Sequence, residues 1–303
     1  MDIPYFRCLI LFLVVLMSGC DDSPSSSNVS GDVAKSSEAQ QRYYFGFDIR
    51  SSPQEDARQY LPLLAYLKKQ TGFNFDIRFT PASNNIGDDL RTGRIDFAAI
   101  GAVSFIKANS NKSNTSAPPI IPVARGINNL SQAEYRSFII VHPDSEIKTP
   151  KQLRNKRFAF GNINSTQGHL IPRIILEAAN IRLKDFRSFK YTGSHQQCAD
   201  AVISKRFDAC GLQDTLAQTL ADKNLVRILH RSDYFPSSGI AASGKLNADV
   251  IGKVQQALLK FDPLDKHAKD LYHWDRTEMQ YGFAPARDSD YDILRQALSA
   301  LKL

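Results

Sequence analysis

Several features that would indicate other classes of protein are missing from this 303-residue chain. Its formal net charge is +7, but Lys and Arg form no cluster with interleaved aromatic residues, so nucleic acid is not an expected partner. The six histidines include no His-x-x-x-His pair, so neither a metal site nor a cofactor is expected. Ser165 and His169 lie one helical turn apart, yet without a Gly-x-Ser-x-Gly motif or a third partner they do not predict an enzyme.

Long hydrophobic runs are scarce as well. The apolar run Cys8–Met17 is too short to span a bilayer, which takes about 20 apolar residues, and no later run is long enough. Residues 1–19 therefore predict a signal peptide. Its end, LMSGC at residues 16–20, resembles the lipobox of bacterial lipoproteins. That resemblance implies cleavage before Cys20 and a lipid anchor on its thiol, and Asp21 with Asp22 favours retention at the inner membrane.

Aromatic residues are absent from the segment that follows the signal peptide. Residues 20–41 are rich in Ser and cannot bury a core, so they are predicted to form a flexible tether. The folded part then starts near Arg42 and runs to Leu303. This length is large for a single hydrophobic core and predicts two lobes.

Cysteine is rare, and two of the four cysteines are not expected to be available for a disulfide. Cys8 leaves with the signal peptide and Cys20 carries the lipid. Cys198 and Cys210 remain, in a compartment that permits disulfides. The sequence leaves open whether they pair or stay as buried thiols.

Apolar strand patterns alternate with helical patterns through most of the folded part. This alternation is typical of α/β lobes with a largely parallel sheet, and two such lobes predict a ligand cleft between them. The expected strands are 43–47, 73–79, 95–100, 120–124, 135–141, 186–191, 207–211 and 226–229. The expected helices are 60–68, 86–92, 197–204, 215–221, 248–261 and 290–301.

The stretch FAFGNINSTQGHLIP, residues 158–172, is the most informative part of the chain. It begins as a buried strand that ends at Gly161, continues as small polar residues and passes into a helical pattern. Ser165 and Thr166 are residue types that cap helices. Because free N–H groups at a helix start attract negative charge, this stretch predicts a binding site for an oxyanion.

Six stretches between residue 43 and about residue 261 together carry a family resemblance. They are FGFDIRSSPQED, FTPASNNIGDDLRTGRIDFAAIGAVSF, YRSFIIV, FAFGNINSTQGHLIP, YTGSHQQCADAVISKRFDACG and DYFPSSGI. They resemble the lipid-anchored or periplasmic substrate-binding proteins of phosphate, phosphite and phosphonate ABC transporters. The resemblance implies an α/β chain with the type II periplasmic-binding-protein fold, in which two crossover strands join two lobes around a ligand cleft. Lobe 1 would comprise 42–137 and about 238–303, and lobe 2 about 138–237.

The resemblance also implies a set of ligand-binding residues. Ser165 and Thr166 match the family's hydroxyl residues that hold the oxygens of the ligand, with Gln167 beside them. His195, in the run TGSH, matches a pocket histidine that could donate from either ring nitrogen, and a bound anion would favour its charged form. Tyr135 matches a tyrosine near the crossing strands that donates its hydroxyl.

Two positions depart from the family pattern. Ser83, followed by Asn84, stands where a tyrosine is common; both could still donate to a ligand. Relatives that bind aminoalkylphosphonates hold the ammonium group of the ligand with acidic residues at two places. This chain has Asp214 at the first, but Ser237-Ser238 at the second, where an aspartate would stand. This favours phosphate, phosphite or a simple alkylphosphonate. Arg50 is a further candidate, because a guanidinium matches two oxygens, although a solvated loop arginine is the alternative.

Together these features predict a lipid-anchored periplasmic solute-binding protein without catalytic activity. It would capture a phosphorus oxyanion as a monomer and present it to an ABC permease in the inner membrane. A ligand-sensing input for a membrane signalling partner is the alternative, because it would need the same closure and the same anchor. The sequence does not separate the two.

Overall fold

The structure, a computed structural model, describes residues 41–81, 84–110 and 117–303. The predicted signal peptide, most of the tether and the lipidation site Cys20 lie outside these residues, and so does Ser83. Within the described residues, no helix combines the length and apolar character needed to cross a bilayer. Nor does this part of the chain gather three His, Cys, Asp or Glu side chains in a way that could hold a metal ion.

The first of two larger sheets has six strands. Their spatial order is β13 (Phe283–Pro285), β4 (Ile121–Gly126), β12 (Gly239–Ala242), β3 (Phe97–Ile100), β1 (Arg42–Phe47) and β2 (Asn74–Ile77). β1 runs parallel to β2 and β3, whereas β12 and β13 are antiparallel to their neighbours. The sequence patterns predicted β1 to β4 but not β12 or β13, which are short and carry no alternation. The sheet is therefore less parallel than expected.

Helices cover both faces of this first sheet. α1 (Pro53–Thr71) and α7 (Ala248–Leu259) pack on one face, and α2 (Ile86–Thr92), α3 (Ala102–Ser110) and α8 (Asp292–Ala300) pack on the other. Strand β3 explains why both faces need helices. Its residues Phe97 and Ala99 belong to the hydrophobic core under α1 and α7, and Ala98 and Ile100 belong to the core under α2, α3 and α8. Successive side chains of a strand point to opposite faces, so an all-apolar strand needs cover on both.

The helix ends follow the local capping chemistry. The Ser52 side chain accepts a hydrogen bond from the Glu55 N–H at the start of α1, and Gly72 ends the helix in the left-handed conformation. Gly93 ends α2 in the same way, as predicted. Helix α3 was missed, because β3 and the first half of α3 form a largely apolar run with only Gly101 and Ser104 in it, and periodicity does not separate a buried helix from a strand in such a run.

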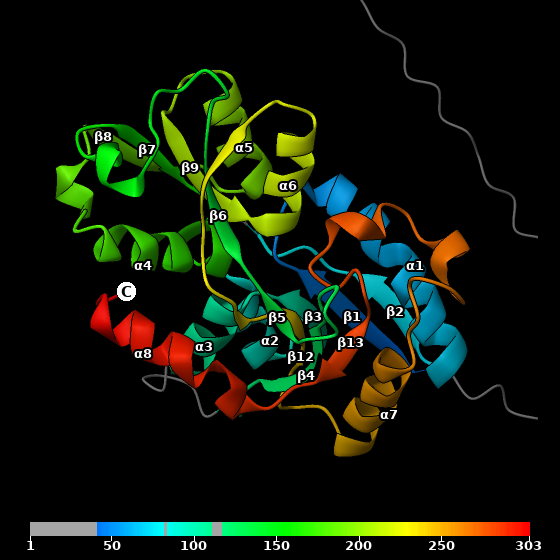
Figure 1. Ribbon diagram of the computed structural model, residues 1–303. Helices are drawn as coiled ribbons and strands as arrows, with labels where there is room; N and C mark the ends of the chain where they lie inside the picture. Colours follow the sequence, from blue (N-terminus) through cyan, green and yellow to red (C-terminus); the bar gives the residue numbers. More distant parts are fainter. Residues whose placement is uncertain (1–40, 82–83, 111–116) are drawn as a thin grey trace, which may run out of the picture. The chain divides into compact units, whose positions relative to one another are not determined.

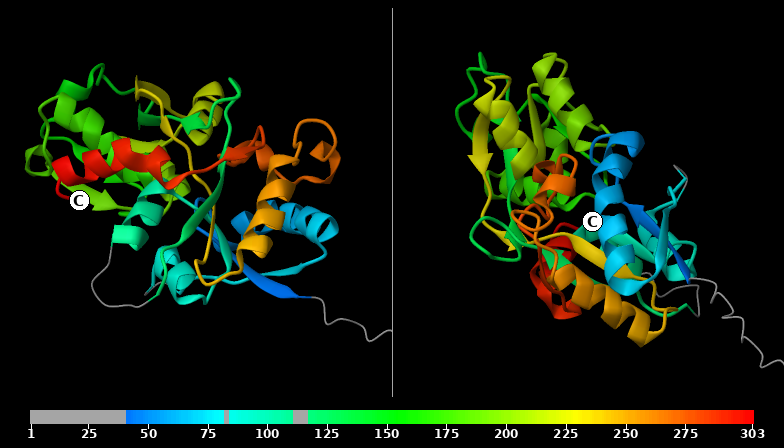
Figure 2. Two further views of the ribbon diagram at one scale, coloured as in Figure 1. Left: turned by 90° about the horizontal axis from the view of Figure 1, so that it is seen from below. Right: turned by 90° about the vertical axis from the view of Figure 1, so that its right-hand side faces the viewer.

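The second sheet has five strands and carries its own helices. The strand order is β10 (Arg227–Arg231), β6 (Ser137–Val141), β9 (Ala209–Gln213), β7 (Arg157–Phe160) and β8 (Ser188–Tyr191). α4 (Ile171–Ala178) packs on one face, and α5 (His195–Ile203) and α6 (Asp214–Asp222) pack on the other. Figures 1 and 2 show this lobe in green to yellow, apart from the blue strands β1 and β2 of the first sheet.

Two short strands link the sheets. β5 (Glu134–Tyr135) lies between β4 and β6, and β11 (Phe235–Pro236) lies between β10 and β12; the two pair antiparallel. The chain thus crosses from the first sheet to the second and returns, and the predicted architecture of two α/β lobes with two crossing strands is confirmed. The remaining helical turns are the π-helical η2 (Thr166–Leu170) and the 3₁₀ turns η1 (Pro150–Leu153), η3 (Leu183–Asp185), η4 (Ala268–Asp270), η5 (Trp274–Arg276) and η6 (Asp288–Tyr291).

Cys198 and Cys210 form a disulfide, which answers the question that the sequence left open. Cys198 lies in the first turn of α5 and Cys210 lies in β9, and both are fully buried. The bond therefore fastens the start of α5 to the central part of the second sheet.

Candidate functional site

A cavity of about 50 Å³ lies between the loops of the two sheets. Asp48 follows β1 and Gly101 follows β3, while Asn162 follows β7 and Ser194 follows β8. The cavity therefore sits at the carboxyl ends of parallel strands, the usual position of a ligand site in α/β folds. The other residues that line it are Ile49, Arg50, Ser104, Tyr135, Asn164, Ser165, Thr166, Gln167, His195, Ser238 and Glu278.

Ser165 and Thr166 line the cavity with hydroxyl groups that can still donate. Ser165 caps the helical turn η2, because its Oγ accepts a hydrogen bond of 2.8 Å from the Gly168 N–H. Thr166 Oγ1 accepts a bond of 2.9 Å from the Val103 N–H at the start of α3. A hydroxyl oxygen that accepts from a backbone N–H keeps its own proton for another partner. Both side chains are thus oriented as donors, and the bond to Val103 also holds the two lobes together.

His195 lines the cavity as a neutral side chain. Its Nδ1 lies 3.3 Å from the Gln213 N–H and accepts from it, so the ring proton is on Nε2. Burial lowers the pKa of His195 to about 4, although the Glu278 charge opposes that shift. The expectation that either ring nitrogen could donate therefore does not hold, because Nδ1 is occupied. Nε2–H is the remaining donor.

Tyr135 lies at the crossing between the lobes, 4% exposed. Its hydroxyl lies beside the hydroxyls of Thr166 and Ser238, yet within the described part of the chain it makes no hydrogen bond of normal geometry. Burial raises the pKa of Tyr135, so the group keeps its proton. A buried hydroxyl without a partner is costly, and a ligand oxygen in the cavity would satisfy it.

Gln167 is fixed by its amide nitrogen. Nε2 donates to the Arg136 carbonyl at 2.7 Å and to Asp214 Oδ1 at 3.2 Å. Asp214 does not itself line the cavity; it lies behind Gln167 and also accepts from the Arg136 and Thr215 N–H groups. Burial raises the pKa of Asp214 to about 6 against those bonds. Direct contact between Asp214 and the ligand thus stays a prediction. In the structure, Asp214 accepts a hydrogen bond that fixes the Gln167 side chain.

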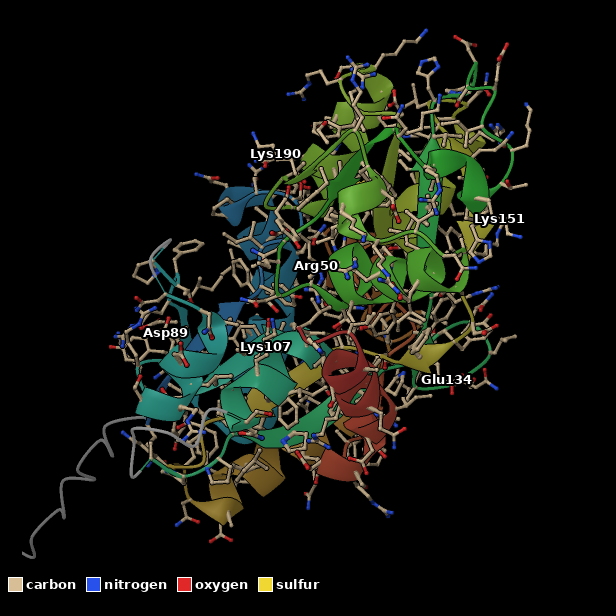
Figure 3. The ribbon with its side chains drawn as sticks, turned by 90° about the vertical axis from the view of Figure 1, so that its left-hand side faces the viewer. Arg50, Asp89, Lys107, Glu134, Lys151 and Lys190 are labelled. Atoms are coloured by element: carbon tan, nitrogen blue, oxygen red, sulfur yellow. A yellow bond between two sulfur atoms is a disulfide. The ribbon has the colours of Figure 1, made fainter. Side chains whose placement is uncertain are left out.

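Arg50 lines the cavity, but its charge is already paired. Its Nη2 donates to Glu278 Oε2 at 2.7 Å, and its Nη1 donates to the Tyr60 hydroxyl at 2.9 Å. The two charged side chains are only 11% and 4% exposed. Burial alone would raise the pKa of Glu278, but Arg50 brings it below its ordinary value. Figure 3 labels Arg50 where the green segments of lobe 2 meet the blue and teal segments of lobe 1.

Asp48 is a second acid at the cavity. Its Oδ2 accepts from the Gly101 N–H at 2.8 Å, and the Ser104 hydroxyl bonds to it as well. Burial raises the pKa of Asp48, even though these bonds and the nearby Arg50 oppose the shift. Asp48 and Arg50 both come from the turn that follows β1.

The structure does not bring every predicted residue to the cavity. Asn84 lies at the exposed end of the loop before α2, where its amide bonds to Asp89, and Ser83 lies outside the described residues. Conversely, the sequence did not single out Glu278 or Ser104. Glu278 follows η5 in a stretch with neither strand nor helix periodicity. Its position at the cavity becomes clear only from its contact with Arg50, which lies 228 positions away in the sequence.

The geometry defines a class of protein. Hydroxyl and imidazole donors converge on a small cavity between two lobes. Such a site can bind a small oxyanion. The protein is a binding protein of the two-lobed periplasmic kind.

Comparisons with known proteins identify the family. Residues 45–291 match the family described as "ABC transporter, phosphonate, periplasmic substrate-binding protein". The chain belongs to this family, whose members are substrate-binding components of transporters rather than enzymes, and it is a periplasmic protein on that ground. The family resemblance drawn from the sequence is thereby confirmed.

Two curated relatives are similar to this chain in sequence. It is 30% identical over 162 residues, 51% of this chain and 46% of the relative, to the probable ABC transporter phosphite binding protein PhnD1 of Prochlorococcus marinus (strain MIT 9301). The chain thus spans about half the length of that relative in the alignment. It is 26% identical over 253 residues, 80% of this chain and 73% of the relative, to the phosphonates-binding periplasmic protein of Escherichia coli (strain K12).

The solved structure of PhnD1 in complex with methylphosphonate has a TM-score of 0.74 at 21% identity and covers 86% of this chain and 98% of its own. The periplasmic aliphatic sulphonate binding protein SsuA of Escherichia coli has a TM-score of 0.58 at 16% identity, with 87% of each chain covered. These likenesses confirm the type II periplasmic-binding fold. They do not select a ligand, because the same fold holds phosphonate-binding and sulphonate-binding proteins.

Proposed function

We propose that this protein captures a small phosphorus oxyanion, a simple phosphonate, phosphite or phosphate, and delivers it to an ABC permease of the inner membrane. The observation that carries the proposal is the convergence of the Ser165, Thr166 and Tyr135 hydroxyls on one cavity. An oxyanion removed from water needs a donor for each of its oxygens, and these side chains with His195 supply them.

The size of the cavity supports a small ligand. A water molecule needs roughly 10–15 Å³ measured in the same way, so about 50 Å³ suits a group of a few heavy atoms. The Prochlorococcus relative was solved with methylphosphonate, a ligand of that size. Lipid attachment at Cys20 would keep the protein at the membrane, and the N-terminal mass of protein extracted from membranes tests that part.

A thermal-shift screen of the purified protein tests the ligand class. Phosphate, phosphite, methylphosphonate, 2-aminoethylphosphonate and sulfate are compared at equal concentration. A ligand at 100 times its dissociation constant adds about 2.7 kcal/mol to the free energy of unfolding, so a true ligand should raise the melting temperature clearly. If none of the phosphorus compounds raises it, the proposed function is wrong.

Thr166→Val keeps the shape of the side chain but removes its hydroxyl, which can donate to a ligand and which accepts from the Val103 N–H. The variant should lose at least about 1.5 kcal/mol of binding free energy, roughly a tenfold rise in Kd, because hydrogen bonds to charged groups lie in this range. Titration calorimetry with the ligand found in the screen measures the change. Thr219→Val, on the exposed face of α6 and bonded only to the Thr215 carbonyl, is the matched control and should leave Kd unchanged. Equal affinity in both variants would contradict the role of the Thr166 hydroxyl.

A further inference from the structure

Glu278 gives the cavity an acceptor, although its ligand is expected to be an anion. The carboxylate receives one bond from Arg50 and one from the Ser238 hydroxyl. Two carboxylate oxygens offer about four lone-pair positions, so Glu278 keeps capacity to accept more bonds. An oxyanion with only bare oxygens could not use that capacity and would be repelled by the charge.

The side chain of Gln167 adds a second acceptor. Its Oε1 is buried and has no partner among the described residues, and the residue is 1% exposed. The amide cannot be turned round, because the Arg136 carbonyl and Asp214 Oδ1 that face its nitrogen are both acceptors. Gln167 therefore presents a carbonyl oxygen, and satisfying it takes a donor from outside the protein.

The charge balance of the cavity also favours a ligand that carries a hydrogen-bond donor. Among the described residues that line it, Arg50 carries the one positive charge and Glu278 matches it, while Asp48 is a further acid and His195 is neutral. A fully deprotonated dianion would thus meet no net positive charge. An anion that keeps a proton brings less charge and supplies the donor that the acceptors lack.

We propose that Glu278 makes the site selective for an oxyanion that still carries a hydroxyl on its central atom, which donates to the Glu278 carboxylate. The inference rests on the proposed function and narrows its substrate class. Phosphorus oxyanions whose second ionisation lies near that of a phosphate monoester, at about pH 6, still carry one such hydroxyl in roughly a tenth of their molecules at pH 7, and Glu278 would bind that protonated form. Sulfate and sulfonates have none. Glu278 thereby separates phosphonates from sulfonates of the same shape.

Titration calorimetry of the purified protein with methylphosphonate and methanesulfonate tests the proposal, because the two probes share a methyl group and three oxygens. The wild type should bind methylphosphonate at least about 100-fold more tightly, since methanesulfonate cannot donate a bond to the charged Glu278 carboxylate and brings a bare oxygen against it. Glu278→Gln replaces one acceptor oxygen by a donor that suits bare oxygens, so it should lower the ratio of the two affinities at least about tenfold.

Glu146→Gln is the matched control, because Glu146 is exposed in the loop after β6 and does not line the cavity. Its affinity ratio should equal that of the wild type. A wild type that binds both probes within about threefold, or a Glu278→Gln variant that keeps the full ratio, would overturn the inference. The wild-type comparison needs no variant, so it can overturn the inference even if Glu278→Gln is unstable. Failure to bind any phosphorus oxyanion would instead overturn the proposed function itself.

Discussion

Replacement of Arg50 by methionine should lower the free energy of unfolding by about 3 kcal/mol or more at pH 8. The substitution keeps an apolar stem but leaves Glu278 buried without its cation, and breaking a buried ion pair by removing one partner costs about 3–5 kcal/mol. The Tyr60 hydroxyl loses its guanidinium partner as well. Urea unfolding followed by circular dichroism measures the change.

The loss in Arg50→Met should depend on pH with a defined sign. In the wild type the pKa of Glu278 lies below its ordinary value of 4.5, so its stabilising contribution is present above that value and is lost as pH falls through the folded-state pKa. In the variant, burial without Arg50 raises the pKa of Glu278 above 4.5, and folding then favours the protonated form. The destabilisation should therefore be larger at pH 8 than at pH 5.

An exposed ion pair provides the matched control for this prediction. Arg42 and Asp76 are 2.8 Å apart, close to the Arg50–Glu278 distance, but their side chains are 63% and 46% exposed. Arg42→Met should cost at most about 1 kcal/mol. The double variant Arg50→Met/Glu278→Met replaces the pair with apolar side chains and should recover most of the loss. Similar losses in Arg42→Met and Arg50→Met would show that burial does not matter at the Arg50–Glu278 pair.

Loss of the Cys198–Cys210 disulfide should cost about 3 kcal/mol of stability. The two cysteines are 12 positions apart, and cross-linking a loop of roughly that length restricts the unfolded chain by about this amount. The variant Cys198→Ala/Cys210→Ala, compared with the oxidised wild type in urea, measures it. Wild-type protein kept in a reducing agent is the companion measurement and should approach the variant.

The same variant should also weaken ligand binding. His195 begins α5 three positions before Cys198, and Gln213, whose N–H holds His195 Nδ1, lies three positions after Cys210. The disulfide thus fastens together the two segments that orient the imidazole. If the variant keeps full affinity while losing stability, the disulfide acts on folding alone and not on His195.

Residues with local signals were predicted well from the sequence. Ser165 caps its helical turn as its residue type implied, and Gly93 ends α2 where the pattern stopped. The elements that were missed lack such signals. Helix α3 continues an apolar run, and β12 is a four-residue apolar strand without alternation. In both cases tertiary burial, and not local propensity, decides the structure.

The residues of the candidate site also divide into those with a local sequence signal and those without one. The residues around Ser165 and His195 could be predicted because a short motif carries them. Glu278 could not, since nothing near it in the chain shows that it meets Arg50. The state of His195 also depends on the folded structure, because the Gln213 N–H fixes its tautomer and burial lowers its pKa. Sequence indicated the donors of the site, and the structure was needed to find its acceptors.

The ion pair between Arg50 and Glu278 also sets the order in which the protein can become functional. The pair joins positions 228 residues apart, and β13, just beyond Glu278, completes the edge of the first sheet. Contacts this distant in sequence form late, because the intervening chain must first be brought together. A product truncated before residue 278 would therefore keep Ser165, Thr166 and His195 yet leave Arg50 without its counter-charge. We therefore expect ligand capture only from a chain that includes its C-terminal segment.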